Sequence, residues 1–169
     1  YAALSRDVLR YLDLLADDVL SLDEYTRGTV MTRSADSLVT DSAAAATAYA
    51  TGKHVNNHEV SEDPEGRRIG TILEAAELAG MRTGVVTTAR VTHATPAAFT
   101  AHVMQRDNEE EIALQQLGLG LELLLGGGME FYTDEPERTR RRDGRNLVEE
   151  AQRDWGFDVA TTAEELADL

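Results

Sequence analysis

Val39-Thr40-Asp41-Ser42-Ala43-Ala44-Ala45-Ala46-Thr47 places a serine at the start of a run of strong helix formers. The run from Ala43 to Ala50 predicts a helix that ends at Gly52, since glycine is common just past a helix C-terminus. The residues before it, Ser37 to Thr40, favour a strand. Ser42 would then lie among the free backbone N–H groups of a helix N-terminus, which attract anions. Helix statistics alone favour a simpler interpretation, in which the serine or the aspartate before it only caps the helix.

Helical and extended patterns alternate on both sides of this stretch. Apolar residues at intervals of three and four predict a first helix from about Ala2 to Leu20. Further helices are predicted over residues 71–79, 96–104, 108–117, 146–156 and from 162 onward. Extended segments are predicted over residues 29–31, 83–88, 121–125 and 157–160. This alternation favours a parallel sheet covered by helices on both faces, so the predicted fold class is α/β, with sites at the carboxyl ends of strands.

Three further segments are predicted to be irregular. Residues 56–68 are polar, contain Pro64 and Gly66, and are expected to form an exposed loop. Residues 132–145 are the best candidate for a linker, although no domain boundary stands out. Gly126-Gly127-Gly128 indicates a sharp turn, and it resembles a phosphate-binding loop only superficially because no lysine follows it.

The composition limits the classes of partner. Thirty-one acidic residues against 16 basic ones give a net charge of −15, which disfavours binding to nucleic acid or to anionic lipid surfaces. The apolar run over residues 119–125 is too short for a transmembrane segment, and no signal-peptide pattern opens the sequence. Cysteine is absent, so any metal must be bound by oxygen or imidazole. All the basic residues except Lys53 are arginine, a pattern that salt adaptation and a coding bias explain equally well.

The nine residues from Val39 to Thr47 resemble the active-site signature of the alkaline phosphatases at every defined position. The resemblance continues in the same order and spacing from about Arg33 to the C-terminus. It is carried by Gly70 to Ala76, Gly84 to Thr88, Ala94 to Ala98, Ala101 to Val103, Arg106, Leu123 to Gly128 and Asp143 to Leu147. It implies that residues 1–169 are part of an alkaline phosphatase catalytic domain, a three-layer α/β/α sandwich with a mostly parallel sheet that is incomplete in this chain.

The resemblance also implies roles for three residues. Ser42 would attack the phosphorus of a phosphate monoester, become a phosphoserine and contact zinc. Arg106 would hold two nonbridging phosphate oxygens with its planar guanidinium, and Asp41 would orient it. Without the resemblance, Arg106 would be interpreted as a cation near a helix C-terminus. The segment Thr40 to Ala44 lacks the glycines of the serine-esterase nucleophile elbow, which argues against that class.

The resemblance implies two zinc ions and one magnesium ion as cofactors, with Ser42, Thr95 and His93 among their ligands. Thr95 aligns with a hydroxyl ligand of the magnesium site, although by itself it would be a helix N-cap before Pro96. His93 stands where family members carry aspartate or histidine beside the third metal. Because a neutral imidazole attracts magnesium less than a carboxylate does, the magnesium site is expected to be weaker than in relatives with aspartate. As a bare sequence feature, His93 would be a surface residue.

The remaining histidines and a cluster of arginines are given structural roles. His102 is assigned to packing or to a supporting hydrogen bond within a helix. His54 and His58 have the spacing of a helical metal pair, but the glycine and asparagines around them oppose a helix there. The family's usual tyrosine-asparagine-glycine turn is replaced by Asn56-Asn57-His58, which leaves the conformation of this loop open. Arg138 to Arg142 is interpreted as a solvated basic patch rather than a phosphate-recruiting surface.

The predicted function is hydrolysis of phosphate monoesters through a phosphoserine at Ser42, with zinc and magnesium. Most of the family's metal ligands are not found in this sequence, so the chain is expected to be a fragment of a longer enzyme. The alternatives are an inactive phosphatase-like module that binds anions at Ser42 and Arg106, a sulfatase or another phosphoryl-transfer relative, and an acidic structural domain. The resemblance further implies a homodimer and an extracytoplasmic location, whether periplasmic, secreted or vacuolar.

Overall fold

The computed structural model describes Tyr25 and residues 27–169. Residue contacts divide the chain into two compact units, Tyr1–Val30 and Met31–Leu169. Every helix and strand named here belongs to the second unit. The helix predicted from about Ala2 to Leu20 lies outside the described residues.

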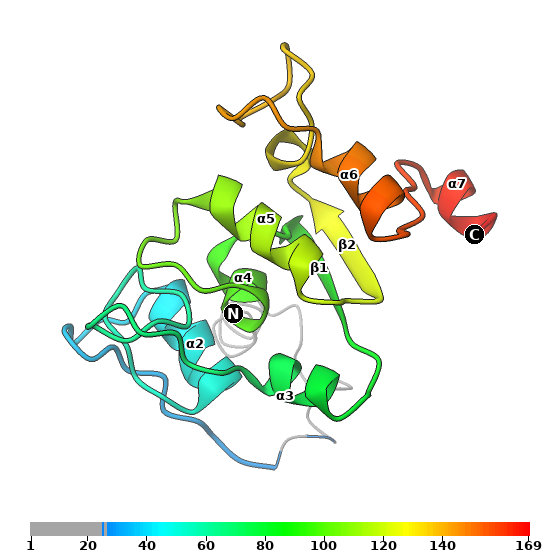
Figure 1. Ribbon diagram of the computed structural model, residues 1–169. Helices are drawn as coiled ribbons and strands as arrows, with labels where there is room; N and C mark the ends of the chain where they lie inside the picture. The colour runs from blue at the N-terminus through cyan, green and yellow to red at the C-terminus, as the bar shows by residue number, and fades with distance from the viewer. Residues whose placement is uncertain (1–24, 26) are drawn as a thin grey trace, which may run out of the picture. The chain divides into compact units, whose positions relative to one another are not determined.

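Helices and strands follow one another along the second unit in the order shown in Figure 1. They are α2 (Ser42–Thr51), α3 (Ile72–Leu78), β1 (Gly84–Arg90), α4 (Ala94–Thr100), α5 (Glu109–Gly118), β2 (Leu123–Gly127), the 3₁₀ helix η2 (Met129–Phe131), α6 (Leu147–Asp154) and α7 (Ala163–Ala167). The predicted alternation of helices and strands is therefore confirmed as a partial α/β fold. No helix among the described residues is long and apolar enough to cross a membrane.

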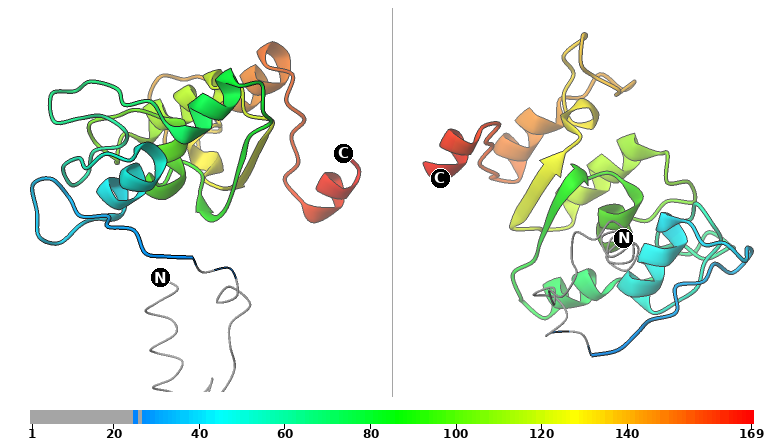
Figure 2. Two further views of the ribbon diagram at one scale, coloured as in Figure 1. Left: turned by 90° about the horizontal axis from the view of Figure 1, so that it is seen from below. Right: turned by 180° about the vertical axis from the view of Figure 1, so that it is seen from behind.

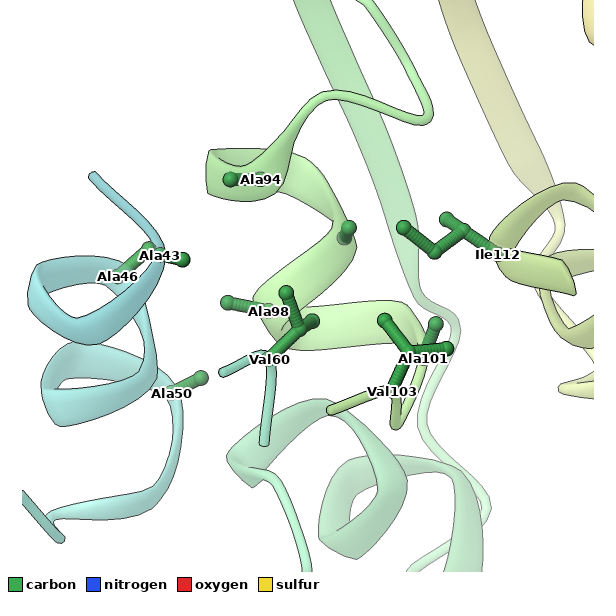
Figure 3. Packing of buried hydrophobic residues seen from close by; sticks show 10 residues of the cluster. Ala43, Ala46, Ala50, Val60, Ala94, Ala98, Ala101, Val103 and Ile112 are labelled. Atoms are coloured by element: carbon green, nitrogen blue, oxygen red, sulfur yellow. The ribbon is translucent and has the colours of Figure 1, made fainter. Parts of the chain in front are cut away.

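Helix α2 is fixed at both ends by the residues that the sequence indicated. Asp41 caps its N-terminus, and Gly52 follows its last residue in the left-handed conformation, with φ of 72°. Helices α2 and α4 lie side by side (Figure 2), and the small side chains on one face of α2 let the two helices pack closely (Figure 3). The buried residues of this contact are Ala43, Ala46 and Ala50 of α2 and Ala94, Ala97 and Ala98 of α4. The alanine run therefore specifies both the helix and the surface that it buries.

Strands β1 and β2 lie side by side and pair in parallel (Figure 2). Gly84 pairs with Leu123, and the close approach needs a glycine because a Cβ at position 84 would lie 2.8 Å from the Leu123 Cβ. Leu124 packs against a cluster of buried residues that includes Ala113 and Leu117 of α5 and Leu147 and Ala151 of α6. On the opposite face of the pair, Val86 is 69% and Leu123 is 42% exposed. Within the described residues, then, the sheet is covered on one face, whereas the sequence predicted a sheet covered by helices on both faces.

Three predicted extended segments are absent from the described structure. Residues 29–31, 37–40 and 157–160 have no strand, and Ser42 does not follow one. Leu38 and Val39 are 105% and 78% exposed, so the apolar residues that favoured a strand before Ser42 find no partner strand among the described residues. Side-chain hydrogen bonds, described below, hold this segment instead.

The boundaries of α4 also differ from the prediction. The N-cap is His93 rather than Thr95, and Pro96 is the third residue of the helix. The helix ends at Thr100, so His102 lies beyond it. Proline is tolerated throughout the first helical turn because the N–H groups there have no intrahelical partner. A proline therefore indicated the helix without fixing its first residue.

Two loops are more buried than predicted. Glu59, Val60 and Ser61 lie at 5%, 0% and 0% exposure inside the segment predicted to be an exposed loop. In the predicted basic patch at 138–142, the Arg141 side chain is 2% exposed and donates to the carbonyl oxygens of Phe131 and Glu110. Hydrogen bonds to the backbone offset the cost of burying polar groups at these positions. A polar composition therefore did not reveal that they are buried.

Candidate active site

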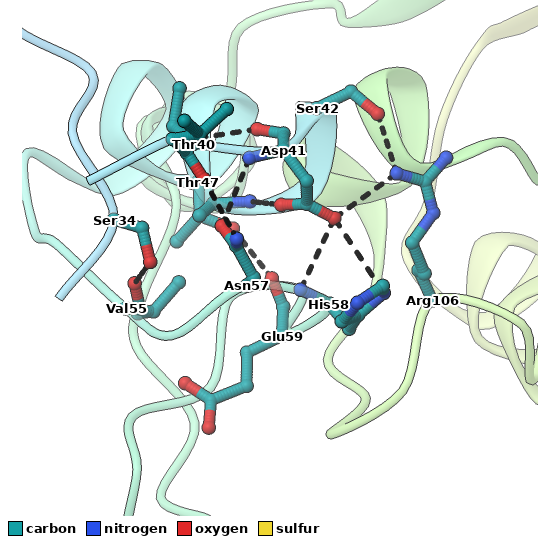
Figure 4. A network of polar contacts seen from close by, with 12 residues as sticks. Ser34, Thr40, Asp41, Ser42, Thr47, Val55, Asn57, His58, Glu59 and Arg106 are labelled. Atoms are coloured by element: carbon teal, nitrogen blue, oxygen red, sulfur yellow. Dashed lines mark hydrogen bonds and ion pairs between the residues drawn. The ribbon is translucent and has the colours of Figure 1, made fainter. Parts of the chain in front are cut away.

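Ser42 is the first residue of α2, and the residue before it caps the helix. The Oδ1 atom of Asp41 accepts a hydrogen bond from the backbone N–H of Ala44 at 2.9 Å. The capping role that the simpler interpretation gave to Asp41 is therefore present. It does not exclude a second role, since the other carboxylate oxygen is free to bind elsewhere. Ser42 itself is left partly exposed, with its hydroxyl directed away from the helix (Figure 4).

Arg106 reaches this helix terminus from the turn that follows α4. Its Nη1 atom donates to Ser42 Oγ at 2.6 Å and to Asp41 Oδ2 at 3.2 Å, as Figure 4 shows. The side chains of Arg106 and Asp41 are 18% and 19% exposed, so their ion pair is partly shielded from water. Residues 64 positions apart thus meet at one point. A guanidinium beside a hydroxyl and a helix N-terminus can hold a tetrahedral oxyanion.

His93 contacts the other side of the same guanidinium. Its Nε2 atom lies 3.1 Å from Arg106 Nη2 and must accept, because a guanidinium only donates. Burial and the positive charges of Arg106 and Arg90 lower the pKa of His93 below its ordinary value. The neutral imidazole that accepts this hydrogen bond is therefore the favoured form. The interpretation of His93 as a plain surface residue is wrong.

A second ion pair lies beside His93 and was not predicted. The Nε and Nη2 atoms of Arg90 donate to the two carboxylate oxygens of Glu109 at 2.9 and 2.7 Å, and Thr92 donates to the same carboxylate. Burial raises the pKa of Glu109, but the hydrogen bonds from Arg90 and Thr92 outweigh it, and the net shift is downward. Three consecutive glutamates begin α5, and no feature of the sequence distinguishes the buried one, Glu109, from the other two.

The predicted metal ligands do not form a complete site in the described residues. Thr95 is exposed in the first turn of α4 and makes no hydrogen bond to Ser42, His93 or Arg106 within the described structure. Residues 25 and 27–169 contain no group of three or more histidine, cysteine, aspartate or glutamate side chains that could hold a metal ion. Ser42, Thr95 and His93 therefore offer at most part of a ligand set, and their metal roles stay predictions.

The other histidines have structural roles, as predicted, although His102 lies after α4 and not within a helix. His102 is buried, and its Nδ1 and Nε2 atoms lie 2.8 Å from Ser61 O and 2.9 Å from Glu74 Oε1. His58 lies in a turn with φ of 73°, not in a helix. The turn at Asn57 and His58 contacts Asp41 directly, a connection that no sequence signal indicated.

Fold and site together describe an α/β protein with an oxyanion-binding arrangement at a helix N-terminus. The family model described as "Alkaline phosphatase" matches residues 10–169. The chain belongs to the alkaline phosphatase family.

Individual relatives support this assignment. The chain is 49% identical over 152 residues to the repressible alkaline phosphatase of Saccharomyces cerevisiae, a match that covers 83% of this chain and 27% of the relative. It is 42% identical over 146 residues to an alkaline phosphatase of Schizosaccharomyces pombe, with the same two coverages. The chain thus spans about a quarter of the length of these curated relatives.

Solved structures of alkaline phosphatases resemble the fold. The Thermus thermophilus enzyme matches with a TM-score of 0.80 and 37% identity, over 90% of this chain and 32% of that one. A mutant of the alkaline phosphatase from the Antarctic bacterium TAB5, with histidine changed to aspartate and magnesium bound in the M3 site, matches with a TM-score of 0.70. That match has 32% identity and covers 85% of this chain and 42% of the other.

Proposed function

We propose that the full-length protein hydrolyses phosphate monoesters through a phosphoserine at Ser42. The observation that carries this proposal is the hydrogen bond of 2.6 Å from Arg106 Nη1 to Ser42 Oγ at the N-terminus of α2. The two groups are close enough to contact one phosphoryl group. The 49% identity to the repressible alkaline phosphatase of S. cerevisiae supports the reaction class.

The proposed reaction has two displacements at phosphorus. Ser42 Oγ forms a bond to phosphorus as the ester P–O bond breaks, and the leaving oxygen is protonated to an alcohol. Water then breaks the Oγ–P bond, which releases inorganic phosphate and restores the serine. The guanidinium of Arg106 would bind two nonbridging oxygens as charge shifts onto the leaving group. Asp41, which accepts from the same Nη1 atom, would keep the guanidinium in place.

The described residues leave one requirement unmet. A serine hydroxyl is a weak nucleophile unless a base or a metal activates it. Arg106 is the group that hydrogen bonds Ser42 Oγ in the described structure, and a guanidinium cannot take up a proton. We therefore propose that two zinc ions and one magnesium ion act in the full-length protein, with most ligands supplied from outside the described residues. Ser42, Thr95 and His93 would add to those ligands.

The direct test uses the full-length protein with zinc and magnesium supplied and p-nitrophenyl phosphate as substrate. Ser42→Ala should lower kcat by about 10³-fold or more, because the covalent step is lost. Thr162→Ala is a matched control, since it removes a hydroxyl from the N-terminus of α7. It should leave kcat unchanged. Equal activity of Ser42→Ala and wild type would contradict the proposal.

An inactive module that binds anions without turnover is a second candidate. The absence of a three-ligand metal cluster in residues 25 and 27–169 favours it for the isolated chain. Isothermal titration with inorganic phosphate separates the two candidates. Binding without hydrolysis by the zinc- and magnesium-loaded full-length protein would favour the module.

His93 is proposed to weaken the magnesium site. The magnesium-bound TAB5 mutant, in which aspartate replaces a histidine, supports a corresponding role for this residue. His93→Asp in the full-length protein should tighten magnesium binding by about 10-fold, because a carboxylate is a stronger ligand for a hard cation than an imidazole. Calorimetric titration with magnesium measures this directly. Identical binding curves for the two proteins would refute the role.

The complete fold of the domain, the assembly of the protein and its location are proposed from membership of the family. We propose that residues 1–169 belong to one catalytic domain with a three-layer α/β/α sandwich. The exposed face at Val86 and Leu123 would be covered by the rest of the protein. Phosphate monoesters are the proposed substrates, a homodimer is the proposed assembly, and an extracytoplasmic compartment is the proposed location.

A further inference from the structure

The turn at Asn57 and His58 contacts three parts of the candidate active site. We propose that this turn sets the relative positions of Ser42 and Arg106, and that Asn57 is a positioning residue for the reaction. The inference rests on the function proposed above, because it concerns the alignment of the same two groups. It adds two residues, Asn57 and His58, to which the sequence assigned no role in the reaction.

Asn57 holds the segment that leads into Ser42. Its Oδ1 atom accepts from the backbone N–H of Asp41 at 2.9 Å, and its Nδ2 atom donates to the carbonyl oxygen of Val39 at 2.9 Å. One side-chain amide therefore binds the backbone on both sides of Thr40, as a neighbouring strand would. Because residues 37–40 form no strand, this amide replaces the missing ladder.

The backbone of His58 connects the two partners of the ion pair. Its N–H donates to Asp41 Oδ2 at 3.2 Å, and its carbonyl oxygen accepts from the backbone N–H of Arg106 at 2.9 Å. The same Asp41 oxygen accepts from Arg106 Nη1 at 3.2 Å (Figure 4). These three hydrogen bonds close a ring that fixes both the backbone and the guanidinium of Arg106 relative to the helix N-terminus. His58 adopts the left-handed φ of 73° that this arrangement requires.

The turn is itself anchored to the helix that carries Ser42. The buried carboxylate of Glu59 accepts from the backbone and side-chain nitrogens of Asn56 at 2.7 and 2.9 Å. The backbone N–H of Ser61 donates to the hydroxyl of Thr47, a fully buried residue of α2, at 3.0 Å. A turn held in this way cannot shift without breaking buried hydrogen bonds, so it can act as a rigid support.

Loss of Asn57 should therefore change catalysis more than folding. Asn57→Ala removes both bonds to the segment before Ser42 while the anchors at Glu59 and Thr47 remain. A displacement of reacting groups by about 1 Å can cost about 10²-fold in rate, so we expect kcat to fall by about 10- to 100-fold. Asn146→Ala is the matched control. Its amide also makes two hydrogen bonds, to Glu149 N–H and Asp134, at the start of α6.

The experiment combines Asn57→Ala with Arg106→Ala in the full-length, zinc- and magnesium-loaded protein, with p-nitrophenyl phosphate as substrate. If Asn57 acts by aligning Arg106 with Ser42, its loss should matter little once the guanidinium has been removed. Asn57→Ala should then lower kcat/KM by less than about 3-fold in the Arg106→Ala background, against about 10-fold or more in the wild-type background. A purely structural role gives the same loss in both backgrounds.

Each outcome decides the proposal. Equal losses in the two backgrounds, or wild-type kcat for Asn57→Ala, would overturn it, as would an equal loss in Asn146→Ala. If Asn57→Ala does not fold, Asn57→Asp keeps an acceptor for Asp41 N–H and is compared in the same two backgrounds. If the wild type binds inorganic phosphate without hydrolysing the ester, the proposed function fails. In that case, weaker phosphate binding by Asn57→Ala than by the wild type would still support the positioning role. Equal binding by the two proteins would reject it, as would a wild type that binds no phosphate.

Discussion

Arg106 is the residue on which the site depends most directly. Its guanidinium donates to Ser42, Asp41 and His93, and its backbone N–H donates to His58. A lysine has no planar fork and could not satisfy three such acceptors in one orientation. The geometry therefore demands arginine at this position, not only a positive charge.

Arg106→Lys in the full-length protein should lower kcat/KM for p-nitrophenyl phosphate by about 10²-fold, since one or more donors to the reacting group are lost. Arg145→Lys is a suitable control, because Arg145 also makes a two-point contact with a carboxylate, that of Glu150. That pair lies outside the candidate site and should affect stability alone. Retention of full activity by Arg106→Lys would exclude two-point binding of phosphate.

Glu74 and His102 form a hydrogen-bonded pair that supports the loop after α2, because His102 also contacts the carbonyl oxygen of Ser61 in that loop. Burial raises the pKa of Glu74, but hydrogen bonds from Thr71 and His102 lower it more, so the net shift is downward. A depressed carboxyl pKa contributes stability that is fully present above the unfolded pKa of about 4.3 and is lost as the pH falls through the folded value.

Glu74→Gln should therefore reduce the unfolding free energy at pH 7 by about 1 kcal/mol and flatten its dependence on pH between about 5 and 3. Urea titrations of the full-length protein at several pH values measure both effects. Glu137→Gln, at an exposed loop position, is the control and should leave the slope unchanged. An unaltered slope in Glu74→Gln would show that this carboxyl does not couple folding to pH.

At the scale of elements, the contact between α2 and α4 controls how closely Ser42 approaches the rest of the site. Both helices present alanine at the contact, so their backbones lie close together (Figure 3). Such a contact has no room for added methylene groups, since protein interiors are close-packed. The alanine run from Ala43 to Ala50 thus has a packing role besides its helix propensity.

Ala98→Leu should destabilise the fold by about 1–3 kcal/mol, because Ala98 has no exposed surface and the larger side chain must displace α2. Ala75→Leu on the exposed side of α3 makes the same chemical change where there is room, and it should cost less than about 0.5 kcal/mol. Denaturant unfolding of both variants measures the difference. Equal stabilities would mean that the helix contact is loose.

Helix caps were predicted better than strands at this scale, although the predicted cap Thr95 lies inside α4, whose N-cap is His93. Asp41, Asn146 and Thr162 cap their helices as the sequence indicated, because a cap is formed within three or four residues. Strands were less predictable. The apolar character of Ser37 to Thr40 matched a strand, yet a strand also needs a partner, and the described residues provide none there.

At the scale of the whole molecule, the acidic excess is the dominant property. With a net charge of −15, the excess carboxylates repel one another, and salt screens that repulsion. Many of the arginines are paired locally with carboxylates, as in Arg67 with Asp63 and Arg153 with Asp154. Exposed pairs of this kind contribute little each, so they do not offset the long-range repulsion.

If the composition reflects salt adaptation, the melting temperature of the full-length protein should rise by several degrees between low and molar potassium chloride. Differential scanning calorimetry at a series of salt concentrations tests this. Comparing chloride with sulfate separates charge screening from general salting-out, since screening acts with either anion. An unchanged melting temperature would leave the coding bias as the explanation for the arginine content.

The sequence by itself determined the family, the helix that carries Ser42 and the caps of three helices, because these depend on residues that are neighbours along the chain. The resemblance also predicted that Asp41 orients Arg106. Tertiary structure alone decided that the turn at Asn57 and His58 meets Asp41, since these contacts span 16 and 17 positions. It also decided which charged side chains are buried, Glu109 among them. The three glutamates at the start of α5 look alike in the sequence, and only the packing of helices and strands buries Glu109.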